Sequence, residues 1–337
     1  MQPSFNIVCG DFIKSLLEKS HYDVADLVVK TYIDHEEKKT INPDSYFLRF
    51  PEKDNARIIA LPAAISGGDK ISGIKWIASY PDNLEYNLQR ASAVLILNDY
   101  NTGYPFACLE SSQISSHRTA ASAVKAAELL ANCEKQSNKI AIIGAGVIAR
   151  TISSYLKGLD WNIDTIDIYD QNYESASHLK NFIRNELNFD VTAKTSLKES
   201  VKNASHIFLT TTASTPYILD ESFFSAGQVI INVSLRDIGP RIILNSYNIV
   251  DDIEHCLKAN TSPHLAEKEV KNRNFINGTI AQVFNKNLFL KHDKPIIFSP
   301  FGLGVLDLSL GYYIYKKAIE SNEATEIPFF FPLVNRW

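Results

Sequence analysis

The feature of this 337-residue chain that most constrains its fold is a glycine turn between two apolar segments. Residues 139–143 form a short apolar run, typical of a strand that is buried on both faces of a parallel sheet. Gly144-Ala145-Gly146 follows at once, and apolar residues then recur at helical spacing from Ile148 to Leu159. A strand, a glycine turn and a helix in this order predict a dinucleotide-binding Rossmann unit. The alternative is a strand-to-helix turn that binds nothing.

The segments after this turn continue the alternation of strands and helices. Helical patterns lie between the expected strands, and Ser196 with Glu199 is typical of a capping box at a helix start. Strands are expected at residues 163–170, near Val191, and at 206–212, 228–234, 247–250 and 295–299. This alternation predicts a doubly wound parallel sheet, which we place in a Rossmann domain at residues 123–305.

The rest of the chain has a different pattern. Strand-like segments at 57–62, 71–79 and 93–98 are separated by Pro, Gly and Asn. A helix is expected at 108–130, and a second one at 306–318 returns to this region. The predicted fold class is therefore α/β, with the Rossmann sheet inserted in a second, α+β domain for substrate binding and dimerisation, made of residues 1–122 and 306–337.

Composition and charge exclude several classes of function. The formal net charge of −4 argues against nucleic acid as a partner. The four cysteines have neither metal-site nor disulfide spacing, so no metal is expected. Without a basic and apolar leader or a run of about 18 apolar residues, we expect a cytoplasmic protein that does not enter the membrane. The apolar tail at 328–334 is expected to pack on the chain itself or on a second subunit.

The glycine turn and the strand ends beside it carry the predicted cofactor site. Gly144 permits the tight turn, and Gly146 lets the backbone approach a pyrophosphate at the helix N-terminus. Threonines end the fourth strand on the same edge of the sheet, although they are equally typical of ordinary strand residues. The expected contacts here are Gly144, Gly146, Val147, Ile148, Thr211 and Thr212.

Asp170 selects between the two nicotinamide cofactors. It ends the second strand, where a carboxylate accepts hydrogen bonds from the adenosine ribose. It would also repel a 2′-phosphate, and Gln171 and Asn172 supply no cation to receive one. The sequence therefore favours NAD over NADP. Asp167 is the competing acidic residue, but it lies within the strand and is interpreted as a structural or an exposed residue.

Several segments together resemble one known family. In order and spacing they are similar to the ornithine cyclodeaminase/mu-crystallin family, over a stretch from about Arg49 to Ala318. These segments are residues 71–77 (Ile-Ser-Gly-Ile-Lys-Trp-Ile), 118–121 (Arg-Thr-Ala-Ala), the turn at Gly144, and 232–237 (Asn-Val-Ser-Leu-Arg-Asp). The resemblance implies an NAD-dependent oxidoreductase that acts on an amino acid and is a homodimer.

One branch of the family is more similar than the rest. Residues 90–99, 104–105 and 110–112 resemble its dehydrogenases of N-((2S)-2-amino-2-carboxyethyl)-L-glutamate. The resemblance implies that hydride leaves the α-carbon of the glutamate half for NAD. Hydrolysis of the imine then releases 2-oxoglutarate and L-2,3-diaminopropionate, a precursor for siderophores or peptide natural products.

A substrate with three carboxylates requires cations, because desolvated carboxylates must be paired. Arg118 and Lys75 match the family's carboxylate-binding positions, and Arg49 matches a third. Lys75 is also a catalytic candidate, although it could be an edge lysine that extends to solvent. Arg57 and Arg90 are further candidates on charge alone, and each could equally form a structural ion pair.

Asp237 is the residue expected to transfer protons. It follows the fifth strand at the carboxyl edge of the sheet, and it matches the family's catalytic aspartate. There it could activate water for attack on the imine, although an aspartate that binds loop amides is the alternative. Ser234 is expected to contact the cofactor, and so is Gly304. Gly302, Gly304 and Asp307 resemble the family's closing turn near the nicotinamide, although a purely structural loop is an equal alternative.

Two other functions stay open at this point. The first is an ornithine or lysine cyclodeaminase that recycles NAD internally and releases ammonia. Residues 234–236 depart from the glycine-rich turn of those enzymes, which disfavours this reaction. The second is a crystallin-like nucleotide binder without catalysis.

Overall fold

The computed structural model describes residues 3–132 and 135–332, so Cys133 and residues 333–334 of the apolar tail lie outside the described part. The chain divides into two compact units. Unit 1 consists of Met1–Arg118 and Leu303–Trp337, and unit 2 is Thr119–Gly302. The first boundary falls inside helix α3 (Ser112–Leu130). The boundaries expected from the sequence, 122/123 and 305/306, stay a prediction.

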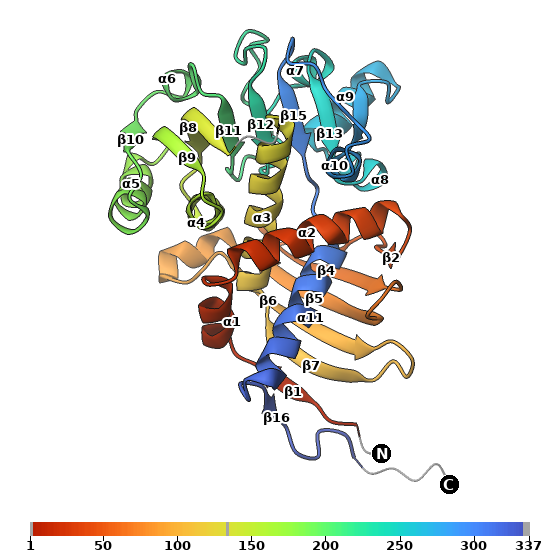
Figure 1. The fold of residues 1–337 in the computed structure, drawn as a ribbon. Coiled ribbons are helices and arrows are strands. Elements are labelled where there is room, and N and C mark those ends of the chain that lie inside the picture. The colour runs from red at the N-terminus through yellow and green to blue at the C-terminus, as the bar shows by residue number, and fades with distance from the viewer. Residues whose placement is uncertain (1–2, 133–134, 333–337) are drawn as a thin grey trace. The chain divides into compact units, whose positions relative to one another are not determined.

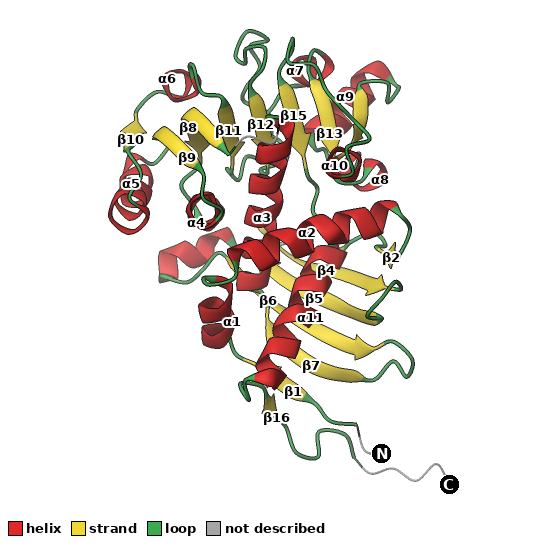
Figure 2. Cartoon of the chain, viewed as in Figure 1, coloured by secondary structure: helices red, strands yellow, loops and turns green. Residues whose placement is uncertain are grey.

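Unit 2 is built on one sheet, whose strands run parallel to one another among the described residues (Figure 2). The strands are β8 (Gln136–Ile143), β9 (Asn162–Tyr169), β10 (Val191–Lys194), β11 (His206–Leu209), β12 (Val229–Asn232), β13 (Tyr247–Val250), β14 (Ile276–Thr279) and β15 (Ile296–Ser299). Their order is β10-β9-β8-β11-β12-β15-β13-β14, which confirms the predicted doubly wound sheet. The sequence did not indicate β14.

Helices connect these strands, and the direction of winding changes between β8 and β11. From β8 the chain adds β9 and β10 on one side, and then returns to place β11 on the other side. Open sheets of this type bind ligands at such a switch point, at the carboxyl ends of the strands. The helices are α4 (Val147–Gly158), α5 (Tyr173–Leu187), α6 (Leu197–Val201), α7 (Pro240–Leu244), α8 (Ile253–Cys256), α9 (Ser262–Val270) and α10 (Ile280–Phe284).

Unit 1 contains a mostly antiparallel sheet with helix α11 (Gly304–Glu320) against one face (Figure 1). The strand order is β16-β1-β7-β6-β5-β4-β2, and β3 also pairs with β4. The strands are β1 (Asn6–Val8), β2 (Thr40–Ile41), β3 (Tyr46–Phe50), β4 (Lys53–Ile65), β5 (Ile71–Ser79), β6 (Ala91–Asp99), β7 (Pro105–Glu110) and β16 (Thr325–Glu326). The other helices are α1 (Gly10–Leu17), α2 (His21–Glu36) and the 3-10 helix η1 (Pro81–Tyr86).

Two glycines allow α11 to lie close to the strands. A Cβ atom on Gly311 would collide with the Leu95 side chain of β6. A Cβ atom on Gly73 of β5 would collide with the carbonyl of Ile96 and would lie 2.8 Å from Leu308 of the helix. This close packing holds the first turn of α11 over β5, where the charged residues described below lie.

The helix expected at 108–130 begins later than predicted. Cys108 belongs to strand β7, in which Ala107 and Leu109 are buried and their neighbours are not. That alternation is a strand pattern, and it outweighs the helical spacing that follows. Glu110 then ends the strand, because its carboxylate accepts the backbone N–H groups of Ser112 and Gln113 at 2.6 and 3.2 Å. The first N–H groups of α3 are thereby satisfied.

The apolar C-terminal segment packs on unit 1. The ring of Phe330 stacks on Phe5 at 3.9 Å between centroids, and Phe331 meets the ring of Tyr104 at 5.3 Å. Of the two alternatives for this tail, contact with its own chain therefore holds for Phe330 and Phe331. Among the described residues, no helix is both long and apolar enough to cross a membrane. The same residues contain no group of three or more metal-ligating side chains.

Candidate active site

The glycine turn of unit 2 has the geometry of a pyrophosphate site. Gly144 has φ +94°, and a Cβ atom there would lie 2.9 Å from the backbone of Thr210. Only glycine therefore fits where the turn passes the end of β11. Gly146 is the N-cap of α4, and no atom lies within 4 Å of where its Cβ would be. The first N–H groups of α4 are thus approachable by an anion, and the residues fit the pyrophosphate of a dinucleotide.

Asp170 is bound to this turn. One carboxylate oxygen accepts the backbone N–H of Ala145 at 2.7 Å, and the other accepts that of Asn172 at 2.8 Å. Each carboxylate oxygen can accept a further hydrogen bond, so ribose hydroxyls could still be bound. The side chain is therefore held beside the glycine turn and can still accept further hydrogen bonds.

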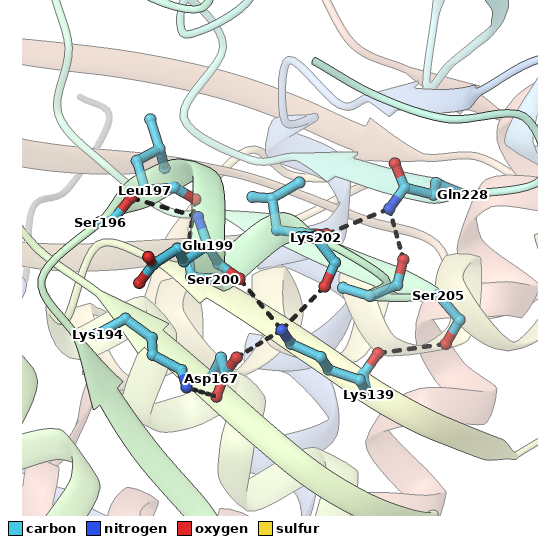
Figure 3. Close-up of polar contacts among 12 residues, drawn as sticks. Lys139, Asp167, Lys194, Ser196, Leu197, Glu199, Ser200, Lys202, Ser205 and Gln228 are labelled. Carbon is cyan, nitrogen blue, oxygen red and sulfur yellow. Dashed lines mark hydrogen bonds and ion pairs between the residues drawn. The ribbon is translucent and has the colours of Figure 1, made fainter. Parts of the chain in front are cut away.

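The competing residue Asp167 has structural partners (Figure 3). It is buried in β9, 2.6 Å from the Nζ of Lys139 and 3.6 Å from that of Lys194. Lys139 also donates to the carbonyls of Glu199 and Lys202 at the end of α6, at 3.3 and 2.9 Å. This lysine joins the aspartate to the negative end of a helix. Asp167 is compensated within the sheet, in agreement with its structural interpretation.

Asp237 is fully buried in unit 2, and its carboxylate is surrounded by hydroxyl groups. The Thr211 hydroxyl is 2.8 and 3.0 Å from its two carboxylate oxygens, and the Tyr217 hydroxyl donates to one of them at 3.1 Å. Ser234 supplies another hydrogen bond. Burial raises the pKa of Asp237 above its ordinary value, and the three hydroxyls oppose that rise. A buried carboxylate with a raised pKa is suited to accept and return a proton.

The backbone around Asp237 is held under strain. Leu235 has φ +76°, a left-handed conformation that costs a bulky residue about 1–3 kcal/mol. The strained residue is held because its carbonyl accepts the N–H of Ser262 at 2.8 Å. Residues 234–236 depart from the glycine-rich turn of the cyclodeaminases. Leu235 nevertheless has a backbone conformation that glycine adopts freely.

The other predicted cofactor residues of this edge have different environments. The Thr211 side chain is engaged within the unit, because its oxygen also accepts the N–H of Ala213 at 3.2 Å. Thr212 is exposed, and Val147 is about half-exposed. Ser234 is buried, and its hydroxyl also lies 3.3 Å from the side-chain oxygen of Asn232. Their cofactor roles stay predictions.

In unit 1, the structure brings Lys75 and Arg118 to one shared carboxylate. Lys75 is buried, and its Nζ donates to Asp307 at 2.7 Å and to Ser115 at 3.2 Å. The Nε of Arg118 lies 3.3 Å from the other oxygen of Asp307. The burial of Lys75 lowers its pKa to about 8, which the charge of Asp307 partly opposes.

This cluster of Lys75, Arg118 and Asp307 has an excess of positive charge. Two cations share one carboxylate when both are protonated. In the part of the chain that the structure describes, the terminal guanidinium nitrogens of Arg118 have no hydrogen-bond partner. A planar guanidinium with free donors is suited to a ligand carboxylate.

Sequence reasoning did not recognise the role of Asp307. It was singled out only as part of a closing turn, but it lies fully buried in the first turn of α11. The available signal was an acid between Leu306 and Leu308 in the apolar first half of the helix, where an unpaired charge would be costly. Gly304 begins the same helix, and a Cβ atom on it would lie 3.2 Å from Leu61 of β4, which indicates a close-packing role in unit 1.

The three other arginines predicted to bind substrate gather at one end of the unit 1 sheet. Arg49 and Arg57 are directly opposite each other on β3 and β4, and Arg57 is opposite Ser79 on β5. Arg90 donates to the Ser79 hydroxyl at 2.8 Å, and burial lowers its pKa. Directly opposed residues share one face of a sheet. Since Ser79 and Lys75 alternate onto the same face of β5, Arg57 lies on the Lys75 side.

Comparison with known proteins places the chain in a family. The ornithine cyclodeaminase/mu-crystallin family model matches residues 18–322. The N-((2S)-2-amino-2-carboxyethyl)-L-glutamate dehydrogenase of Staphylococcus aureus is 32% identical over 314 residues, which cover 90% of this chain and 92% of the relative.

Solved structures agree on the fold. The Δ1-pyrroline-2-carboxylate reductase of Thermococcus litoralis, in complex with NADH and L-proline, has a TM-score of 0.87 at 22% identity and covers 96% of this chain and 100% of its own. An archaeal alanine dehydrogenase dimer with bound NAD has a TM-score of 0.85 at 23% identity, with 97% and 100% covered. The sequence motifs, the two units and these matches agree, and the chain belongs to the ornithine cyclodeaminase/mu-crystallin family.

Proposed function

We propose that this chain oxidatively cleaves N-((2S)-2-amino-2-carboxyethyl)-L-glutamate to L-2,3-diaminopropionate and 2-oxoglutarate, for siderophore or peptide natural-product biosynthesis. The enzyme class is an NAD-dependent oxidoreductase acting on the CH–NH group of an amino acid, as family membership and the dehydrogenases and reductases among its relatives indicate. The observation that carries the choice of substrate is the distribution of cations on the unit 1 sheet.

These cations form two groups. Lys75 and Arg118 share Asp307, whereas Arg57 and Arg90 adjoin Ser79. The two positions on β5 are about 13 Å apart, at about 3.3 Å per residue along a strand. A substrate with one carboxylate would use one group only. The proposed conjugate carries carboxylates at both of its ends and a third between them, so both groups would be used.

The residues that would hold NAD are those of the glycine turn and the neighbouring strand ends. The turn and the N-terminus of α4 would bind the pyrophosphate, and Asp170 would bind the ribose. The residues assigned to NAD are Gly144, Gly146, Val147, Ile148, Asp170, Thr211, Thr212, Ser234 and Gly304. When bound, NAD would accept a hydride from the α-carbon of the glutamate half.

The protein's own groups account for the remaining chemistry. The conjugate, NAD and one water yield 2-oxoglutarate, diaminopropionate, NADH and one proton. Lys75 and Arg118 bind a carboxylate, and the lowered pKa of about 8 allows Lys75 to exchange a proton near neutral pH. Asp237 takes a proton from the water that attacks the imine and returns it to the departing amine.

We also propose that the chain forms a homodimer through the face of the unit 1 sheet opposite to α11. Cross-strand register places Tyr46, Ala60, Trp76 and Val94 in one row across four strands. Tyr46 is 70% and Trp76 is 41% exposed, and contiguous apolar surface of this kind is typical of an interface. A second copy is the proposed occupant, since an archaeal structural neighbour is a dimer. Trp76→Glu should give a monomer in light scattering, and a wild-type monomer would contradict the proposal.

A direct assay tests the reaction. The purified protein, NAD and the synthetic conjugate should accumulate NADH and an equal amount of 2-oxoglutarate, measured by absorbance and mass spectrometry. L-Ornithine, L-alanine and L-proline serve as comparison substrates. Ammonia from ornithine without net NADH would instead identify a cyclodeaminase, and turnover of only the monocarboxylates would reject the substrate.

Arg118→Ala tests the binding site. Loss of one partner of a desolvated charge pair costs about 2–5 kcal/mol, so affinity for the conjugate should fall by that amount while NAD affinity is unchanged. The matched control is Arg241→Ala, because Arg241 forms an exposed ion pair with Glu221. Equal loss of both affinities would indicate a folding defect and contradict the assignment of Arg118.

A further inference from the structure

Asp237 is fully buried, yet the function proposed above requires it to exchange protons. Its carboxylate has zero exposure, and the groups that shift its pKa are the hydroxyls of Thr211, Ser234 and Tyr217. A proton that enters or leaves the carboxylate therefore passes through one of these hydroxyls or requires the loop to open.

Of these three side chains, Tyr217 alone is both bonded to Asp237 and substantially exposed. Its hydroxyl donates to Oδ2 of Asp237 at 3.1 Å, and the residue is 38% exposed. Ser234 is buried, and the Thr211 hydroxyl is already shared between both carboxylate oxygens and the N–H of Ala213. A phenol, with an ordinary pKa near 10, also transfers a proton more readily than an aliphatic alcohol.

The backbone fixes Tyr217 in this position. The N–H groups of Tyr217 and Ile218 both donate to the carbonyl of Asp237, at 3.1 and 3.0 Å. Ile218 also forms an isolated bridge with Ile238, and its carbonyl accepts the N–H of Gly239 at 2.8 Å. The contact between phenol and carboxylate is therefore held by the backbone on both sides.

We propose that Tyr217 is a positioning residue that relays protons between Asp237 and the surface of unit 2, an inference that rests on the proposed role of Asp237. A proton that reaches the phenol oxygen from water is matched by transfer of the phenol proton to Oδ2 of Asp237. The reverse sequence of transfers removes the proton from the carboxylate. The phenol ends each transfer in the state in which it began.

The electrostatics agree with this role. Burial, followed by the charge of Asp237 and a smaller effect of Tyr169, raises the pKa of Tyr217. The phenol is therefore protonated at neutral pH and is a donor to the carboxylate. It does not act as an independent base.

The first test needs no substrate. 3-Fluorotyrosine placed at position 217 should show a ¹⁹F resonance that shifts with pH as Asp237 titrates, above the ordinary carboxyl range. The shift should disappear in Asp237→Asn. The matched control is 3-fluorotyrosine at Tyr247, whose hydroxyl donates to Asp293 at 3.0 Å. A resonance at position 217 that is unaffected by Asp237→Asn would overturn the coupling.

The second test measures turnover. Tyr217→Phe should lower kcat by about 10²-fold, the lower end of the usual effect of an acid–base group, with KM and NAD affinity unchanged. Mono-, di- and trifluorotyrosine at position 217 should change kcat stepwise with phenol acidity. Tyr247→Phe should retain kcat within about twofold.

The two tests separate the two proposals. Wild-type kcat in Tyr217→Phe, or fluorotyrosines that all give the same kcat, would reduce Tyr217 to a structural hydrogen bond and overturn the relay. If the wild-type protein makes no NADH from the conjugate, the substrate proposal fails. The ¹⁹F titration still decides whether Tyr217 is coupled to the protonation of Asp237, because it requires neither substrate nor NAD.

Discussion

Asp237 in unit 2 and Asp307 in unit 1 are both fully buried, but their surroundings differ in charge. Asp237 accepts hydrogen bonds from the neutral hydroxyls of Thr211, Ser234 and Tyr217. Asp307 lies between two cations, 2.7 Å from Lys75 and 3.3 Å from Arg118. The same side chain at the same exposure therefore has two different electrostatic environments.

The two environments suit the two aspartates to different roles, proton transfer for Asp237 and the positioning of cations for Asp307. Hydroxyl groups stabilise a carboxylate without fixing its charge, so burial can raise the pKa of Asp237 and permit proton transfer. Asp307 instead lies between two cations, and its carboxylate holds Lys75 and Arg118 in place. We expect substitution of the first aspartate to affect turnover and substitution of the second to affect stability.

The largest expected effect is that of Asp237→Asn on turnover. Asparagine keeps the size and most hydrogen bonds but cannot take a proton, so kcat should fall by about 10²–10⁴-fold. A single burst of NADH near the enzyme concentration should survive in stopped-flow absorbance, if hydride transfer needs no proton from Asp237. Urea denaturation should show little loss of stability. Wild-type kcat would remove Asp237 from the mechanism.

Asp307→Asn should have the next largest effect, on stability. Removal of the shared carboxylate takes the ionic partner from the buried Lys75 and from the partly buried Arg118, and loss of one partner of a buried pair costs about 3–5 kcal/mol. The free energy of unfolding, measured in urea, should fall by that amount. An equal loss of stability in Asp307→Asn and Asp237→Asn would end the distinction between the two aspartates.

A smaller effect should appear in the pH dependence of stability. The pKa of Lys75 is lowered from 10.5 to about 8, so between these values the unfolded chain binds the proton more tightly than the folded chain. Stability should therefore rise with pH from about 8 to 10.5, by at most about 3 kcal/mol from this group. Urea denaturation of wild type and Lys75→Met across this range isolates the contribution. Identical pH slopes would contradict it.

The smallest expected effect concerns the cofactor and leaves both buried aspartates in place. Asp170→Ser with Gln171→Arg should shift the preference from NAD toward NADP by about tenfold, which corresponds to about 1.4 kcal/mol. The ratio of kcat/KM for the two cofactors measures it. Asp167→Asn is the control. Asp167 is buried in β9, just before Asp170, and pairs with two lysines, so its substitution should change stability alone. A wild-type protein that prefers NADP would contradict the role of Asp170.

The local sequence predicted the elements that its own pattern specifies. The buried strand, the glycine turn and α4 follow directly in the chain, and so does Asp170 at the end of the next strand. Strand β5 was predicted with its observed bounds because turn residues lie directly before and after its apolar run. The start of α3 was wrong because the alternation in β7 merges into the helical spacing without a break.

The side-chain partners required the tertiary structure. Lys75 and Asp307 are far apart in the chain, and nothing near either residue indicates the other. Tyr217 was not a candidate, because its proximity to Asp237 depends on backbone hydrogen bonds between two loops that follow different strands.

By itself the sequence determined the Rossmann sheet and the glycine turn and predicted NAD as the cofactor, since these depend on short-range periodicity and on residues adjacent in the chain. Only the tertiary structure decided that Asp237 lies among hydroxyls and Asp307 between cations. The physical reason is that the behaviour of a buried carboxylate depends on the groups within hydrogen-bond distance, and those groups come from distant segments that folding brings together.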